Sequence, residues 1–393
     1  MLGLLLAGVA ATPAHANSVR SDQWHLDAMK ANEIWKISTG EGVTVAVIDS
    51  GVDDTLPDLR GQVLAGGKDF SELAGDENND IADHGTGIAA KIAGTGARGA
   101  QTGSFGLAPG VKILPIRMPY ASKESVGLES TDTFIRDMSE AIRFAADSPA
   151  HIINVSMGQQ KADSPELGRA VTYALGKNKL IFAAVGNSGH QGNAVEYPAA
   201  TPGVIGVGGV DRQGQHWSRS QTGPQVDFVA PAVKVLAACG PTKLCDGDGT
   251  SNATALASAS AALVWSKNPG WTNNQVLRVL LNTAGKAKSG DARTDLVGYG
   301  SVRPLRALTA PGDPGPADEY PLPDAPGTSG AGASKAPSAV ATTAAPGAEG
   351  EARAVAEKRG DEGGAGVWIA LGVGAAVLVG AGATIAVVRG KRV

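Results

Sequence analysis

Short apolar runs alternate with amphipathic segments along most of the chain. Five runs rich in β-branched residues are typical of buried strands, at 43–48, 111–117, 151–156, 179–185 and 203–210. Segments of helical period lie between them; in residues 133–148, Ile135, Met138, Ile142 and Ala145 share one helix face. Apolar strands interleaved with amphipathic helices predict an α/β domain whose mostly parallel sheet is covered by helices on both faces.

The chain also carries an apolar run that is too long for a strand. The segment from Val367 to Val388 is 22 residues long and carries no charged side chain, and Arg389, Lys391 and Arg392 follow it. As a helix this run spans about 33 Å, enough to cross a bilayer core of about 30 Å. By the positive-inside rule, we expect a single membrane-spanning helix with a cytoplasmic tail at 389–393 and the rest of the chain outside. A buried core helix is the alternative.

The first residues resemble an export signal. A short apolar run precedes Ala14-His15-Ala16, the small-x-small pattern of a signal-peptidase site. We therefore expect a signal peptide at 1–16 and a mature chain from Asn17. A basic stretch before the apolar run is missing, and a buried N-terminal helix is the alternative.

Composition changes between residues 310 and 366. Pro, Ala, Gly and Ser dominate this segment, and large apolar residues nearly vanish. Such a segment buries too little to offset the entropy of ordering it, so we expect a disordered linker. It would tether the globular domain at 17–309 to the membrane helix, with a reach of about 40 Å.

Charge and cysteine usage narrow the class of protein. Lys and Arg (34) nearly balance Asp and Glu (38), for a net charge of −4, and this excludes a nucleic-acid partner.

Cys239 and Cys245 are the two cysteines, six residues apart around Gly-Pro. In an exported chain they predict a disulfide bond. No second Cys or His pair stands at ligand spacing, so we expect no metal centre and no cofactor.

An acidic loop at 75–83 offers oxygen ligands for calcium through Asp76, Glu77, Asp80 and Asp83. Its spacing matches no calcium-binding signature, so we favour a solvated loop.

Four polar residues stand where catalysis needs them in such a sheet. Active sites of parallel sheets lie beyond the carboxyl ends of strands, and Asp49 and Asn187 each follow an apolar strand. His84 and Ser251 each open a run of small residues. Ser251 alone is an ordinary helix cap, because serine oxygens accept the free N–H groups of a first turn. A nucleophile further needs a base, a group that orients the base, and donors for an oxyanion.

Together the four residues resemble a known family. The blocks "VAVIDSGVD", "DHGTGIAAKIAG", "AAVGNSG" and "GTSNA" are similar, in this order, to the Asp, His, oxyanion-Asn and Ser blocks of the subtilisin-like serine proteases. The resemblance implies that Ser251 attacks the scissile carbonyl, His84 takes its proton, and Asp49 orients His84. Asn187 would donate to the oxyanion, and Ser251 would act as both cap and nucleophile.

"IINVSMG" resembles the family's substrate-binding strand, which implies that Ser156, Met157 and Gly158 pair with the substrate backbone. Two blocks depart from the pattern. Ala255 and Leu256 stand where the family usually has Pro and His, and Gly87 replaces a common second His. None of these three positions transfers a proton, so the departures concern helix packing and rate.

The overall layout resembles the mycosins, membrane-anchored subtilisin-like proteases of type VII secretion. Shared features are the export signal, the Trp-containing start of the domain, the Pro-rich linker and the single C-terminal helix. The resemblance implies an extracellular endopeptidase acting on exported proteins. A scaffold subunit of a secretion complex and a scavenging protease are the alternatives. The segment 119–132 is the candidate for restricting access to the cleft.

Overall fold

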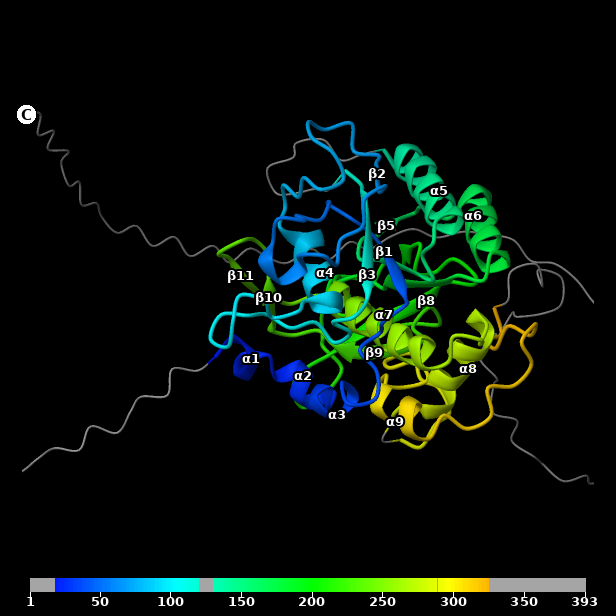
Figure 1. The fold of residues 1–393 in the computed structure, drawn as a ribbon. Coiled ribbons are helices and arrows are strands. Elements are labelled where there is room, and N and C mark those ends of the chain that lie inside the picture. Colours follow the sequence, from blue (N-terminus) through cyan, green and yellow to red (C-terminus); the bar gives the residue numbers. More distant parts are fainter. Residues whose placement is uncertain (1–17, 120–129, 288, 325–393) are drawn as a thin grey trace, which may run out of the picture. The chain divides into compact units, whose positions relative to one another are not determined.

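A seven-stranded parallel sheet forms the centre of the protein. The computed structural model describes residues 18–119, 130–287 and 289–324, and the sheet has the order β2-β3-β1-β4-β6-β8-β9 (Figure 1). Every neighbouring pair in it is parallel. The strands are β1 (Thr44–Asp49), β2 (Lys68–Asp69), β3 (Lys112–Arg117), β4 (Ile152–Val155), β6 (Leu180–Ala184), β8 (Ile205–Val210) and β9 (Phe228–Pro231).

All five strands predicted from the apolar runs are present, as β1, β3, β4, β6 and β8. The predicted mostly parallel α/β fold is therefore confirmed. Two small antiparallel ribbons accompany the sheet. They pair β10 (Val235–Ala238) with β11 (Leu244–Gly247) and β5 (Gln159–Gln160) with β7 (Glu196–Tyr197).

Helices cover both faces of the sheet, and β1 shows why. Val45 and Val47 belong to one buried cluster, which includes residues of α4 and α7, while Ala46 and Ile48 belong to another, which includes residues of α5 and α6. Alternate side chains of a strand point to opposite faces, so a strand buried on both sides is apolar throughout. The helices of these layers are α4 (His84–Ala93), α5 (Thr131–Asp147), α6 (Pro165–Gly176), α7 (Thr250–Lys267) and α8 (Asn273–Thr283).

The N-terminal segment packs against loops near the later strands. It forms three short helices, α1 (Val19–Asp22), α2 (Trp24–Ala28) and α3 (Ala31–Ile34). Gln23 Nε2 donates to the carbonyls of Phe105 and Leu236, and Trp24 Nε1 donates to that of Lys234. These bonds tie the segment to the strand β10.

The packed chain extends further than the composition predicts. After α9 (Pro304–Thr309), residues 310–324 lie along α8 instead of beginning a disordered linker. Arg278 of α8 donates to the carbonyls of Pro314, Pro316 and Glu319, and Leu322 is buried. A Pro-rich segment makes few bonds of its own, but donors on a neighbouring helix satisfy its carbonyls. The boundary expected at 309 is therefore at least fifteen residues too early.

The predicted signal peptide, membrane helix and basic tail lie outside the described residues, as do residues 325–366 of the linker and most of segment 119–132. Among the helices of the described ranges, none has the length and apolarity needed to cross a membrane.

Candidate active site

Asp49 and His84 form the first half of the site. Asp49 ends the fully buried strand β1, and its Oδ1 lies 2.7 Å from His84 Nδ1. The backbone N–H of Ser50 donates to the same oxygen at 2.8 Å. An ionised carboxylate only accepts hydrogen bonds, so Nδ1 of His84 carries the proton in this pair. The other ring nitrogen then presents a lone pair.

Ser251 faces that lone pair. Its Oγ lies 3.2 Å from His84 Nε2, within reach of a hydrogen bond from the hydroxyl. Ser251 is the second residue of α7, and His84 is the first residue of α4. Two helix starts and one strand end therefore meet at this point, as the strand-end rule predicts for a parallel sheet.

Asn187 lies beside the same helix start. Its Oδ1 accepts a hydrogen bond from the backbone N–H of Thr250 at 2.9 Å. Because a backbone N–H can only donate, this bond fixes which end of the amide is oxygen and leaves Nδ2 to donate elsewhere. Asn187 is exposed, and a Cβ placed on Gly249 would lie 2.9 Å from Ser251 Oγ and 3.8 Å from Asn187 Nδ2. The hydroxyl and the amide nitrogen thus border one small space.

The expectation that Ser251 caps its helix is wrong. The cap position of α7 is Gly249, and no side chain of that residue is available to bond to the first turn. Asn187, 63 residues earlier in the chain, accepts the Thr250 N–H instead. The Ser251 hydroxyl is therefore not used by the helix terminus, and it faces His84.

A buried polar chain below Ser251 was not expected from the sequence. Ser258 Oγ donates to Asn154 Oδ1, and Asn154 Nδ2 donates to Ser156 Oγ at 2.9 Å. Ser156 Oγ in turn donates to the carbonyl of Ser251 at 3.3 Å. This chain fixes Ser156, one of the three expected substrate-binding residues, to α7, the helix that carries Ser251. A polar Asn inside the otherwise apolar "IINV" is the signal that would have revealed it.

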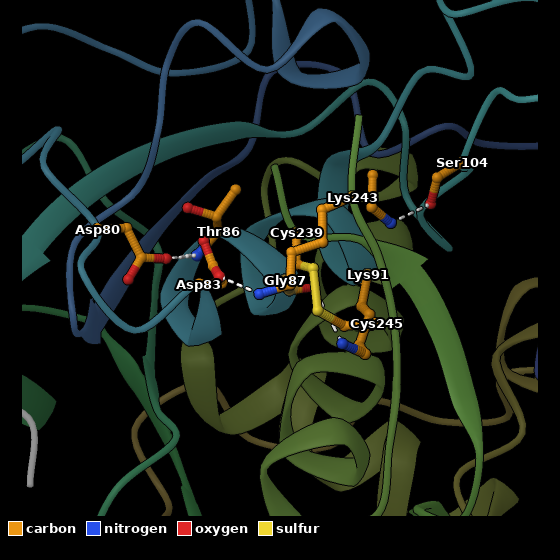
Figure 2. The surroundings of a disulfide bond; sticks show 10 residues. Asp80, Asp83, Thr86, Gly87, Lys91, Ser104, Cys239, Lys243 and Cys245 are labelled. Atoms are coloured by element: carbon orange, nitrogen blue, oxygen red, sulfur yellow. Dashed lines mark hydrogen bonds and ion pairs between the residues drawn. A yellow bond between two sulfur atoms is a disulfide. The ribbon is translucent and has the colours of Figure 1, made fainter. Parts of the chain in front are cut away.

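The predicted disulfide bond between Cys239 and Cys245 is present and closes the β10–β11 hairpin. Figure 2 shows it beside Gly87 of α4. Lys243 of the same hairpin forms an ion pair with Asp83, the residue just before His84. The hairpin is thus attached to the start of the helix that carries His84.

Gly87 explains one departure from the family pattern. A Cβ at this position would be in van der Waals contact with Lys91 Nζ at 3.4 Å and with Cys239 Cβ at 3.6 Å, so a larger side chain would have to displace Lys91 or the hairpin. Lys91 is buried, and this burial lowers its pKa to about 8, although the charge of Asp49 acts in the opposite direction. Ala255 and Leu256, the other departures, are fully buried in α7. All three positions serve packing.

The acidic loop contacts the site through both carboxylate oxygens of Asp80. Asp80 Oδ1 accepts from Ser50 Oγ at 2.7 Å, and Asp80 Oδ2 accepts from the Thr86 N–H at 2.8 Å. Burial raises the pKa of Asp80, while hydrogen bonds from Thr86 and Ser50 oppose the rise. Within the described ranges, no group of three or more His, Cys, Asp or Glu residues is arranged to hold a metal ion.

Comparisons with known proteins agree with this geometry. Residues 40–300 match the model of the subtilase family. Subtilisin Savinase of Lederbergia lenta is 34% identical over 265 residues, which are 67% of this chain and 90% of that protein. Mycosin-1 of Mycobacterium tuberculosis is 32% identical over 346 residues, covering 75% of this chain and 74% of its own length.

Among solved structures, a chain of the periplasmic assembly of the ESX-5 inner membrane complex superposes with a TM-score of 0.66. It is 29% identical, and the match covers 86% of this chain and 92% of that one. Family, relatives and structural neighbour lead to the same assignment. The chain belongs to the subtilase family and is a subtilisin-like serine endopeptidase of the mycosin type.

Proposed function

We propose that this protein hydrolyses peptide bonds of exported proteins at the Asp49–His84–Ser251 site. The observation that carries the proposal is the continuous chain of contacts, with 2.7 Å from Asp49 Oδ1 to His84 Nδ1 and 3.2 Å from His84 Nε2 to Ser251 Oγ. A serine hydroxyl is a weak nucleophile, and a neutral imidazole is the base suited to activate it near pH 7.

In the proposed reaction, Ser251 Oγ attacks the scissile carbonyl as His84 Nε2 takes its proton. Asp49 holds the ring in the tautomer that leaves Nε2 free to accept and stabilises the imidazolium that forms. The negative charge on the carbonyl oxygen is met by Asn187 Nδ2 and by the Ser251 backbone N–H at the positive end of α7. His84 then returns the proton to the leaving amine, and water repeats the sequence on the acyl-enzyme. Ser156, Met157 and Gly158 hold the substrate as an added strand.

The setting of this reaction is part of the proposal. Similarity to Mycosin-1 and to a chain of the ESX-5 periplasmic assembly supports action beside type VII secretion machinery. We further propose a protease domain from residue 17 to at least 324, followed by a tether, the membrane helix at 367–388 and a cytoplasmic tail. Protease protection of the 389–393 tail in sealed vesicles tests this orientation.

Labelling with a fluorophosphonate probe tests the catalytic proposal. The full-length protein in detergent should react at Ser251, and Ser251→Ala should lose both labelling and peptidase activity, the latter by about 10⁶-fold. Ser260→Ala is the matched control and should still label, because Ser260 is buried in the same helix and its hydroxyl donates to the Leu256 carbonyl, away from His84. Labelling that persists in Ser251→Ala contradicts the assignment, and rapid general digestion of casein would favour the scavenging alternative.

A further inference from the structure

Glu196 is a carboxylate without a cationic partner in the part of the chain that the structure describes. It lies in β7, opposite Gln160 of β5. Its Oε1 accepts a hydrogen bond from Gln221 Nε2 at 3.0 Å. None of the ion pairs formed by the described residues includes it. Glu196 is half-buried, so an approaching side chain can still reach it.

Two glycines place this carboxylate next to the catalytic machinery. A Cβ on Gly158 would lie 3.2 Å from Glu196 Oε2, and a Cβ on Gly186 would lie 2.6 Å from Glu196 Cδ. Gly158 is the last of the expected substrate-binding residues, and Gly186 directly precedes Asn187. The carboxylate therefore lies between the segment proposed to hold the substrate backbone and the segment that carries the oxyanion donor.

We propose that Glu196 selects Lys or Arg as the substrate residue whose carbonyl Ser251 attacks, an inference that rests on the proposed function. With that carbonyl at Ser251 and Asn187, the adjoining side chain leaves the backbone between the segments 156–158 and 186–187, where the carboxylate lies. Lys and Arg combine a long apolar stem with a terminal cation. The stem can run past the two glycines, and the cation can form a charge-assisted hydrogen bond with Glu196.

The surroundings of Glu196 favour a cation from outside. Burial raises the pKa of Glu196 to about 7, while hydrogen bonds from the Gln221 and Gln160 side chains oppose the rise. The groups that face it from β5 and from the loop of Gln221 are thus uncharged amides. Above pH 7 the charged carboxylate lacks a counter-ion, and a substrate Lys or Arg supplies one. Below pH 7 the neutral carboxyl has no charge to pair, so the preference should weaken.

Matched peptides test this inference on the full-length protein. The peptides differ only at the residue before the cleaved bond, which is Lys, Arg, Met or Gln, and kcat/KM is measured from pH 6 to pH 9. The ratio of kcat/KM for the Lys and Met substrates cancels any pH dependence that the two peptides share. We expect the ratio to be about ten- to hundredfold at pH 8.5 and to fall toward pH 6.

Two variants complete the test. Glu196→Gln keeps an oxygen for Gln221 and should bring the ratio close to one at every pH while the Met peptide is still cleaved. Glu166→Gln removes the same charge at an exposed site and should leave the ratio unchanged. A Lys preference that survives in Glu196→Gln, or wild-type protein that cleaves Met and Lys peptides equally, overturns the inference and leaves the proposed function standing. If no peptide is cleaved and Ser251 does not label, the proposed function fails, and this inference fails with it.

Discussion

Asn187 and Thr250 join the expected oxyanion donor to the nucleophile helix, because Asn187 Oδ1 accepts from both the N–H and the hydroxyl of Thr250, at 2.9 and 3.0 Å. The oxygen and the nitrogen of the Asn187 amide can therefore serve different functions. The oxygen satisfies the start of α7, and the nitrogen is left to donate elsewhere, as the proposed oxyanion role requires. Substitutions that remove one end or both can separate structure from catalysis.

We expect Asn187→Ala to lower kcat by about 10²–10³, as for loss of one oxyanion donor, and to lower the free energy of unfolding by about 1 kcal/mol, as for loss of a helix cap. Asn187→Asp keeps the acceptor for Thr250 but has no N–H to donate. It should lose kcat to at least the same extent while its unfolding midpoint stays near that of the wild type. Near-normal kcat in Asn187→Asp would contradict the donor role.

We expect Gly249→Ala to lower the peptidase activity. A methyl group there would lie 2.9 Å from Ser251 Oγ, and the backbone of Gly249 is extended, so Gly249→Ala should fold. A misplacement of about 1 Å costs about 10² in rate, so we expect kcat/KM of Gly249→Ala to fall by up to about 10². Gly247→Ala is the control, because a Cβ there meets nothing within 4 Å. Equal activity of the two variants in a peptide assay would show that the space beside Ser251 is not needed.

His25 should make the fold sensitive to acid. It is fully buried, and neither of its ring nitrogens has a hydrogen-bond partner among the described residues. Burial, with smaller contributions from the charges of Lys91 and Arg20, lowers the pKa of His25 to about 3 from its usual 6.5. Between these values the unfolded chain binds the proton and the folded chain does not, so this contribution to stability is lost as pH falls.

The expected slope is up to about 1.4 kcal/mol in the free energy of unfolding per pH unit between pH 6.5 and pH 3. Urea unfolding of the wild type and of His25→Asn at pH 4, 5, 6 and 7.5 measures it. The variant should lose less stability across this range, whereas His190→Asn, at an exposed histidine, should follow the wild type. Identical slopes for wild type and His25→Asn would rule out the assignment.

The disulfide should stabilise the hairpin that adjoins α4. Replacing Cys239 and Cys245 with Ala frees a loop of about seven residues, for which loop-closure entropy gives about 2 kcal/mol. Thermal unfolding should show the loss in the double variant and in reduced wild type to a similar extent, and reductant should not change the double variant further. A wild-type intact mass that reductant leaves unchanged would mean that the bond does not form in the protein.

The pattern of apolar and polar residues along the sequence was enough to predict the parallel sheet and to place the catalytic candidates at its edge. The run 43–48 is apolar at every position except Thr44, which is typical of a strand covered on both faces, and Asp49 follows its carboxyl end. Strands that run parallel bring their carboxyl ends to one edge, so Asp49 and Asn187 were expected together. The order of the four blocks then indicated the family.

Contacts between distant segments were decided by the tertiary structure. Glu196 stands in no recognisable motif; the pairing of β5 with β7 places it opposite Gln160, and packing between distant segments brings it against Gly158 and Gly186. The cap of α7 comes from Asn187 rather than from Ser251, because the free N–H groups of a helix start donate to whichever acceptor the fold brings near.

The C-terminal boundary of the domain likewise could not be predicted from the sequence. Composition predicts disorder after residue 309, because it measures how little a segment can bury. It does not register that Arg278 and neighbouring side chains of α8 supply donors for the carbonyls of residues 314–319. Sequence pattern sets which residues are buried and which elements form; the partner of each polar group depends on packing between elements that are far apart in the chain.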